Sequence, residues 1–421
     1  MSRWCLTLRR RHSSRRVKAS RIMALRQRNR SQPMPANQQG RVKSAVIADA
    51  LFDGTGAEPR RDAAVVFAGG VIEAIRPVAD LSADTEIIAH APVVTPGLID
   101  LQINGAGGVL FNDAPTPQTL ATMAAAARRG GTAYFLPTYV TAHGQGFIDA
   151  MRAVETAISQ GQPGILGIHL EGPFLSPKRP GIHPKDAIRV LDGADIEALG
   201  RDIGGPRLIT LAPEEAPPSA IATLKQNGAV LFAGHSEAGF DTMVEAESQG
   251  LTGATHLFNA MSQITGREPG VVGSVFDSKT LFAGIIADGV HVHPSNLRLA
   301  FRSLGAERLF LVTDAMPTLG TTITEFDLLG KKIHLDGLKL LDSKGTLAGA
   351  HIALDACVQN AIELAGATPA QAVQMATSTP ARAIGMEHRI GRIAPGYSGT
   401  VTLMDKTFAA TDVIYSQHDQ V

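Results

Sequence analysis

Eight short apolar segments alternate with helix-like segments along most of the chain, and this alternation narrows the possible folds. The strand candidates are Leu98–Ile103, Thr132–Pro137, Ile165–Leu170, Leu208–Leu211, Ala229–Phe232, Gly253–Thr255, Leu281–Ile286 and Leu309–Val312. Helical patterns separate most of them, for example Pro117–Arg129, Phe147–Ser159, Ser219–Gln226, Phe240–Gln249 and Pro294–Ser303. Short buried strands joined by helices predict an α/β fold, and eight of them predict a (β/α)8 TIM barrel. A doubly wound open sheet is the structural alternative.

The two ends of the chain share a different pattern. Residues 44–96 consist of short apolar runs separated by turns, and residues 389–421 contain a similar pattern. We therefore expect both ends to pack together as one small β-sandwich domain, outside a catalytic barrel domain at residues 97–388. After the last barrel strand we expect a hairpin lid and then two closing helices, at residues 318–346, 351–365 and 368–384.

Residues 1–43 differ in charge from the rest of the chain. They contain 13 of the 39 basic residues and no acidic residue, so the remainder carries a net charge of −13. A body this acidic is not expected to bind nucleic acid. The basic segment is interpreted as a disordered tail, as a transit peptide, or as a stretch upstream of a start at Met23 or Met34, and we favour the last. An RNA-binding arm is a further alternative.

Cysteine usage and hydropathy exclude other classes of protein. Cys5 and Cys357 are the only cysteines, so neither a disulfide framework nor a cysteine-rich zinc site is expected, and the pair suits the reducing cytoplasm. The sequence contains no run of about 18 apolar residues, so no membrane-spanning helix is predicted. No phosphate-binding glycine motif follows a strand candidate, so nucleotide binding has no support.

Polar side chains stand at the carboxyl ends of the predicted strands, which meet at one rim of a barrel. They are Gln102, Asn104, His169, Glu171, His235, His256, Asp288, His291, His293 and Asp314. Two histidines and one carboxylate on neighbouring strands suit a divalent metal, zinc by default, with one position left for water. Such a metal lowers the pKa of its water towards ~7.

Two of these residues suit catalytic roles beside a metal. Asp314 is expected to take the proton of the water and hand it to a leaving group, and His291 to donate a hydrogen bond to the developing oxyanion. Each polar residue alone also has an ordinary interpretation, such as a helix cap, an ion pair or a packed histidine. His293, which precedes Pro294, is expected to cap a helix. The recurrence of such residues at several strand ends favours a site.

Six motifs follow in order along the chain: His169–Phe174 (HLEGPF), Ala233–Ser236 (AGHS), Thr255–Met261 (THLFNAM), Gly266–Gly270 (GREPG), Asp288–His291 (DGVH) and Val312–Ala315 (VTDA). Together they resemble the motifs of the N-acetylglucosamine-6-phosphate deacetylase family, within the amidohydrolase superfamily. The resemblance covers roughly residues 44–415.

This resemblance implies a reaction and a set of roles. The reaction is metal-dependent hydrolysis of the acetamide of N-acetyl-D-glucosamine 6-phosphate, which gives D-glucosamine 6-phosphate and acetate. The resemblance implies metal ligation by Glu171, His235 and His256. It implies Asp314 as general acid/base and His291 as a catalytic residue that contacts the substrate near its carbonyl.

Substrate contacts are implied by the same resemblance. His183 matches a substrate-binding histidine, and Asn259 with Ala260 matches a phosphate cradle. Arg267 matches an arginine that reaches the phosphate of the neighbouring subunit, so a homodimer is expected. The segment Leu347, Ala348 and Gly349 matches a loop that lines the sugar site.

One position departs from the pattern of the superfamily. Many amidohydrolases carry His-x-His at the end of the first strand, where this chain has Gln102-Ile-Asn104. Neutral amides are poor substitutes for imidazole, so one metal ion per subunit is expected, with Gln102 as a weak or second-metal position. Zinc is the first choice, and iron and manganese are alternatives.

Other activities remain open. One alternative is N-acetylgalactosamine-6-phosphate deacetylase. Its substrate differs in the configuration of one hydroxyl, and these motifs do not distinguish the two sugars. A hydrolase of cyclic amides, such as a dihydroorotase, is disfavoured because His-x-His is missing. A non-catalytic sugar-phosphate sensor would be expected to lack Asp314 or a metal ligand, and all of these are present.

Overall fold

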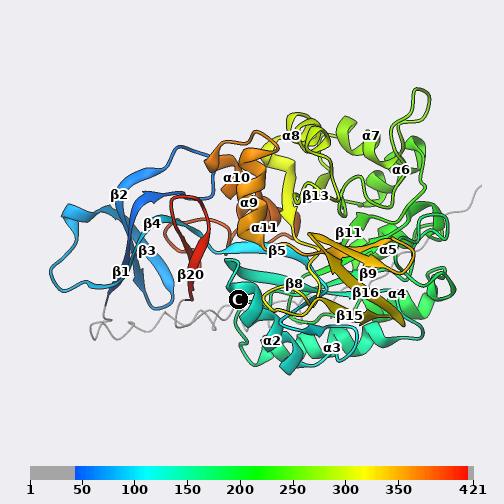
Figure 1. Cartoon of the computed structure of the whole chain (residues 1–421), viewed down its shortest axis with the longest axis horizontal. Helices are drawn as coiled ribbons and strands as arrows, with labels where there is room; N and C mark the ends of the chain where they lie inside the picture. Colours follow the sequence, from blue (N-terminus) through cyan, green and yellow to red (C-terminus); the bar gives the residue numbers. More distant parts are fainter. Residues whose placement is uncertain (1–42, 416–421) are drawn as a thin grey trace, which may run out of the picture. The chain divides into compact units, whose positions relative to one another are not determined.

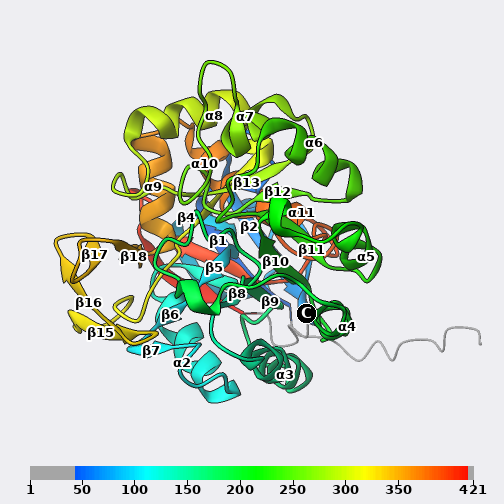
Figure 2. The ribbon, with the colours of Figure 1, turned by 90° about the vertical axis from the view of Figure 1, so that its right-hand side faces the viewer.

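Eight parallel strands follow one another around a barrel in the order in which they occur in the chain (Figure 2). The structure is a computed structural model that describes residues 43–415. The barrel strands are β5 (Leu98–Ile103), β8 (Thr132–Val140), β9 (Ile168–Glu171), β10 (Arg207–Leu211), β11 (Val230–Ala233), β12 (Gly253–Ala254), β13 (Phe282–Ile286) and β14 (Leu309–Val312). All eight predicted strands are thus confirmed, with small shifts at their ends.

The barrel closes between its first and last strands. The backbone N–H of Asp314 donates to the carbonyl oxygen of Gln102 at 3.0 Å, and that of Asn104 donates to Ala315 at 2.9 Å. These bonds join the ends of β14 and β5 and rule out the doubly wound open sheet. They also bring Asp314 next to Gln102 and Asn104.

Alternation along the strands decides which side chains face inward. In β14, Phe310 and Val312 belong to one apolar cluster, whereas Leu309 and Leu311 belong to another that includes the surrounding helices. Because successive side chains of a strand point to opposite faces, the inward series of Phe310 and Val312 continues to Asp314. The same alternation places His169 and Glu171 on one face of β9.

Helices surround the barrel (Figure 2). They are α2 (Pro117–Arg128), α3 (Gly146–Ser159), α4 (Gly193–Leu199), α5 (Ala220–Gln226), α6 (Phe240–Gln249), α7 (Gly270–Asp277) and α8 (Pro294–Arg308). Thr116 caps α2 by accepting from the N–H of Thr119, and proline at the first helical position is compatible with that start. The five helices named from the sequence are confirmed.

The closing helices number three where two were expected. They are α9 (Leu354–Glu363), α10 (Pro369–Met375) and α11 (Ser378–Ala383). A continuous helix is interrupted because Pro380 has no N–H to donate to the carbonyl of Ala376. That carbonyl instead accepts the N–H of Ile99 at 2.8 Å, which ties the helices to the first barrel strand.

Both chain ends contribute to a separate β-rich domain, as expected (Figure 1). Its strands form one sheet in the order β20 (Ala410–Ile414), β19 (Val401–Met404), β4 (Glu86–Pro96), β1 (Ser44–Leu51), β2 (Arg60–Ala68) and β3 (Val71–Pro77). Gly97 links this domain to the barrel, and its N–H donates to Thr400 at 3.1 Å. The interpretations of the basic segment concern residues outside the described range, except for Lys43.

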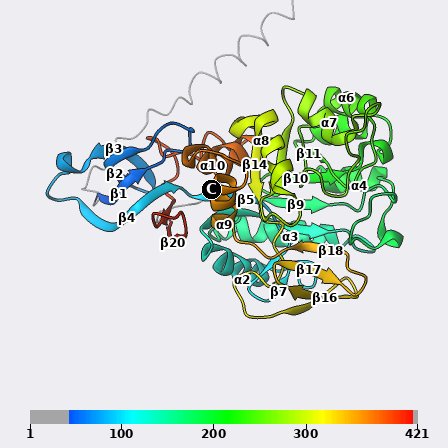
Figure 3. The ribbon, with the colours of Figure 1, turned by 45° about the horizontal axis from the view of Figure 1, so that its top comes forward.

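The expected hairpin lid is a larger unit. Four antiparallel strands form it: β15 (Glu325–Leu328), β16 (Lys331–Asp336), β17 (Lys339–Asp342) and β18 (Leu347–Ala350). Figure 3 shows this sheet on the side of the barrel where α2 and β7 (Val109–Leu110) lie, and β7 pairs with β6 (Gly105–Ala106). The N–H of Ala350 donates to the carbonyl of Asp314 at 2.9 Å, which fixes the sheet to the end of β14.

Among residues 43–415, no helix has both the length and the apolar composition needed to cross a membrane.

Candidate metal centre and active site

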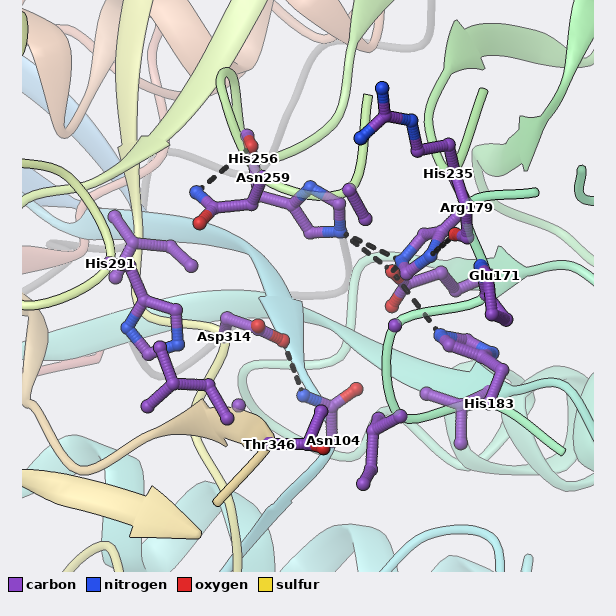
Figure 4. A pocket seen from close by; sticks show the side chains of 18 of the residues that line it. Asn104, Glu171, Arg179, His183, His235, His256, Asn259, His291, Asp314 and Thr346 are labelled. Atoms are coloured by element: carbon purple, nitrogen blue, oxygen red, sulfur yellow. Dashed lines mark hydrogen bonds and ion pairs between the residues drawn. The ribbon is translucent and has the colours of Figure 1, made fainter. Parts of the chain in front are cut away.

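Glu171, the last residue of β9, is the centre of a buried cluster at the carboxyl ends of the barrel strands. Its Oε1 lies 2.9 Å from His235 Nε2 and 2.9 Å from His256 Nε2, and the two Nε2 atoms are 3.2 Å apart (Figure 4). All three residues are nearly inaccessible to solvent. Three groups that commonly bind metal ions therefore converge on one point.

The backbone turns sharply where the strands deliver these groups. His235, His256 and Asp314 have φ angles of 49°, 34° and 52°, and each follows closely on the end of β11, β12 or β14. Residues other than glycine rarely adopt this left-handed conformation, and its strain is concentrated at functional sites. The turns aim the three side chains inward at the rim of the barrel.

His183 joins the same cluster from the loop after β9. Its Nε2 lies 3.8 Å from Glu171 Oε1, and its ring packs edge-on against His235 with centroids 4.4 Å apart. Glu171, His183 and His235 form a group that could hold a metal ion. Gly181 allows this approach, because a Cβ there would meet His235 Cε1 at 3.0 Å and its φ is +55°.

Burial and mutual contact change the ionisation of this cluster. Burial opposes the charge on Glu171, but the neighbouring imidazoles of His183, His235 and His256 hold its pKa well below the usual range. Burial lowers the pKa of His183 to about 4, with a further contribution from His235. His183 is therefore neutral near pH 7 and able to offer a lone pair.

Asp314 faces the cluster and is held by two carboxamides. Asn104 Nδ2 donates to Asp314 Oδ1 at 2.6 Å (Figure 4). Gln102 Nε2 donates to the same oxygen at 3.0 Å. Gln102 Nε2 also lies 3.2 Å from Glu171 Oε2, so it bridges the two carboxylates. Burial, and then the charge of Glu171, raise the pKa of Asp314 to about 6. A carboxyl of this kind can exchange a proton near neutral pH.

His291 lines the pocket from the loop after β13, and Asp314 lies between it and the cluster around Glu171 (Figure 4). Its Nδ1 is 2.6 Å from Asp288 Oδ2, so its ring is held by a carboxylate. His293, two residues later, caps α8 by accepting the N–H of Ser295 at 3.2 Å, as expected.

His169 lies beneath the cluster and does not line the pocket. Its ring nitrogens contact Thr138 Oγ1 at 3.0 Å and Thr210 Oγ1 at 2.7 Å. Burial lowers its pKa to about 4. The residue therefore links three neighbouring strands below Glu171 as a neutral, satisfied histidine.

A pocket of about 360 Å³ opens over these groups. It is lined by Asn104, Val140, Glu171, Lys178, Arg179, Pro180, Gly181, Ile182, His183, His235, His256, Asn259, Ala260, Ile286, His291, Asp314, Met316, Thr346, Leu347 and Gly349. Most residues predicted for the site are therefore brought to one pocket. Of those predicted to bind substrate, Ala348 is packed in the apolar core of the lid instead, and Arg267 is exposed on the loop before α7.

Two cations at the pocket were missed from the sequence. Lys178 is exposed, and Arg179 forms an ion pair with Glu237 while its carbonyl lies 2.9 Å from His235 Nδ1. The basic pair begins five residues before His183 and lies between two prolines. This closeness to His183 in the sequence could have predicted that the pair lies at the pocket. Asp288 was recognised as a strand-end residue, but its hold on His291 was not predicted.

Comparisons with known proteins agree with this arrangement. Residues 93–420 match the model of the amidohydrolase family. The chain is 43% identical over 286 residues to N-acetylgalactosamine-6-phosphate deacetylase of Shewanella sp. (strain ANA-3), covering 65% of this chain and 73% of that protein. It is 35% identical over 340 residues to N-acetylglucosamine-6-phosphate deacetylase of Haemophilus influenzae, covering 80% and 89%. A crystal structure of N-acetylglucosamine-6-phosphate deacetylase from Pasteurella multocida superposes with a TM-score of 0.84 at 34% identity, covering 89% of this chain and 98% of that one.

Proposed function

The chain belongs to the amidohydrolase family, and we propose that it hydrolyses the acetamide of N-acetyl-D-glucosamine 6-phosphate to D-glucosamine 6-phosphate and acetate. One observation carries the proposal: Glu171, His235 and His256 converge within 3.2 Å opposite the raised-pKa carboxyl of Asp314. Relatives that the chain resembles over most of its length are deacetylases of amino-sugar phosphates.

The donor set fits one divalent metal ion. Two imidazole nitrogens and a carboxylate oxygen lie 2.9–3.2 Å apart, close to the spacing of about 3.3 Å between neighbouring ligands of a tetrahedral zinc ion. We therefore assign Glu171, His235 and His256 as ligands, with zinc favoured over iron or manganese. When bound, such an ion polarises the acetyl carbonyl and acidifies a water molecule.

Asp314 is proposed as the general acid/base. Its Oδ1 is occupied by Asn104 and Gln102, which leaves Oδ2 to take a proton from water and return it to the leaving nitrogen. His291, held by Asp288, is proposed to hydrogen-bond the carbonyl oxygen as charge develops on it. The loss of one such donor typically slows turnover by about 10²–10³-fold.

The phosphate is proposed to lie at the mouth of the pocket, near Asn259, Ala260 and His183. A substrate dianion needs local positive charge, because residues 44–421 together carry a net charge of −13. Lys178 and Arg179 line the pocket there, and the charge of Arg179 is partly offset by its ion pair with Glu237.

Arg267 is proposed to reach the phosphate of a neighbouring subunit in a homodimer. Arg267 does not line the pocket of its own chain, and its loop carries Ile264, which is 51% exposed. An exposed apolar side chain beside an exposed cation suits a surface that a second subunit covers.

The galactosamine epimer is a second candidate substrate. The relative from Shewanella, at 43% identity, is a deacetylase of N-acetylgalactosamine 6-phosphate. Only the configuration of one hydroxyl separates the two sugars, and a side-by-side comparison of kcat/KM decides between them.

The test is acetate release from both sugars by wild type and Asp314→Asn, with the metal content measured on the same samples. We expect turnover by wild type with about one metal per chain. The variant should keep its metal and lose about 10²–10⁴-fold in kcat. Metal binding by both proteins without acetate release from either sugar would overturn the proposed substrate class.

A further inference from the structure

Asn104 presents a buried oxygen that has no hydrogen-bond partner among the described residues. The residue is 0% exposed, and its Oδ1 is one of the few buried side-chain polar atoms left unpaired in residues 43–415. Because the carboxylate of Asp314 accepts hydrogen bonds, Asn104 Nδ2 must face it, at 2.6 Å. Figure 4 shows the oxygen of Asn104 turned away from Asp314, towards the side of the pocket where His183 lies.

The backbone holds this oxygen in place. The N–H of Asn104 donates to Ala315 at 2.9 Å, and its carbonyl accepts the N–H of Phe111 at 3.0 Å. The residue also lines the pocket. A buried acceptor without a partner is unfavourable, so its persistence next to the carboxyl proposed as the general acid/base indicates that a ligand completes it.

We propose that Asn104 Oδ1 accepts a hydrogen bond from the N–H of the substrate's acetamide. The inference rests on the proposed function, in which the proton held by Asp314 passes to that nitrogen while the bond between carbon and nitrogen breaks. The nitrogen must therefore come within hydrogen-bonding reach of Asp314. Asn104 Oδ1 lies beside this position, because Nδ2 of the same side chain is bound to Asp314. The hydrogen on the substrate nitrogen then points to Asn104 Oδ1, and the lone pair of that nitrogen is left to accept the proton of Asp314.

This role makes Asn104 a residue that distinguishes amides from esters. An amide N–H satisfies Oδ1, whereas the oxygen of an ester at the same position presents a second acceptor to it. Gln102 provides the matched control, because its Nε2 also supports Asp314 Oδ1, at 3.0 Å. Asn104→Asp provides a second control, because it keeps an oxygen facing the pocket and loses the donor to Asp314.

The experiment compares kcat/KM for N-acetylglucosamine 6-phosphate with that for the analogue in which a 2-O-acetyl ester replaces the acetamide. We expect Asn104→Ala to lower the preference for the amide by about 5- to 10-fold, the size of one net hydrogen bond. Gln102→Leu and Asn104→Asp should lower kcat/KM for both the amide and the ester but keep the ratio between the two. If the ester binds as a competitive inhibitor and is not hydrolysed, the ratio of its KI to the KM of the amide is compared between wild type and variants instead.

Two outcomes would overturn the inference. They are an equal loss on both substrates in Asn104→Ala, or a loss of bound metal specific to that variant. Thermal unfolding of each variant identifies misfolded samples, and Asn104→Leu, which also lacks the acceptor but keeps the volume of the side chain, replaces Asn104→Ala if that variant fails to fold. Failure of wild type to release acetate would instead count against the proposed function itself.

Discussion

His291 Nδ1 lies 2.6 Å from Asp288 Oδ2, while Asp288 Oδ1 accepts the backbone N–H groups of Val290 and His291, both at 2.8 Å. One buried carboxylate thus fixes both the loop and the ring. Residues that orient a catalytic or metal-binding group are typically worth about 10–100-fold in activity.

Asp288→Asn is therefore expected to lower kcat by about 10–100-fold with little change in KM, because the ring loses its orienting acceptor. Steady-state kinetics and circular dichroism measure this. The control is His291→Asn, which should show at least as large a loss. An Asp288→Asn enzyme with unchanged kcat would contradict the positioning role.

The stability of the metal-free protein should depend on the ionisation of Asp314. Its pKa in the folded protein is raised to about 6 from an ordinary value of 3.8. The folded state therefore binds the proton more tightly than the unfolded state does. The stability from this group is present below pH 4 and is lost as the pH rises through 6, by at most about 3 kcal/mol.

Asp314→Asn removes this dependence. After chelation of the metal, we expect the variant to gain stability relative to wild type between pH 4 and pH 7. Denaturant unfolding at several pH values measures the difference. A constant difference between the two proteins across that range would show that Asp314 does not titrate there.

Lys178→Ala should weaken the binding of the phosphorylated sugar. Lys178 lines the pocket and is exposed, so its loss is expected to raise KM by about 3- to 10-fold, more at low salt. Hydrolysis of unphosphorylated N-acetylglucosamine should be unaffected. Lys185→Ala, an exposed lysine in the same loop that does not line the pocket, is the control. Equal effects on both sugars would place the role of Lys178 elsewhere.

Arg267→Ala tests the contribution across a dimer. The variant should raise KM and leave the metal content unchanged, because the arginine lies outside the pocket of its own chain. Mixing Arg267→Ala with Asp314→Asn subunits should restore about a quarter of the sites if each dimer shares its arginines symmetrically.

Arg302→Ala, which removes an exposed arginine of α8, is the control for Arg267. It should leave KM unchanged. Exchange of subunits without recovery of activity, or a monomer in analytical ultracentrifugation, would contradict the shared site.

The sequence was informative where periodicity and burial decide the structure. The apolar runs of β5 and β14 predicted strands, and the polar residues after them predicted the rim that carries Asp314. Motifs that resemble those of a known family supplied the proposed roles of Glu171 and His256, which apolar patterns alone leave open.

Other features depend on contacts that periodicity does not encode. The interruption before α11 arises because the carbonyl of Ala376 bonds to Ile99, far away in the sequence. Lys178 and Arg179 lie in an irregular loop, where only the folded path brings them to the pocket. The free oxygen of Asn104 follows from the orientation of one carboxamide, which Asp314 sets across the closing seam of the barrel.

That seam also gives the site an order of assembly during synthesis. Glu171 meets His235 and His256 across 64 and 85 residues, whereas Asp314 meets Asn104 and Gln102 across 210 and 212 residues. Chains emerge from the ribosome with their N-terminal part first. The groups proposed to hold the metal are therefore synthesised before the carboxyl proposed as the general acid/base, and the closing contacts of the seam form last.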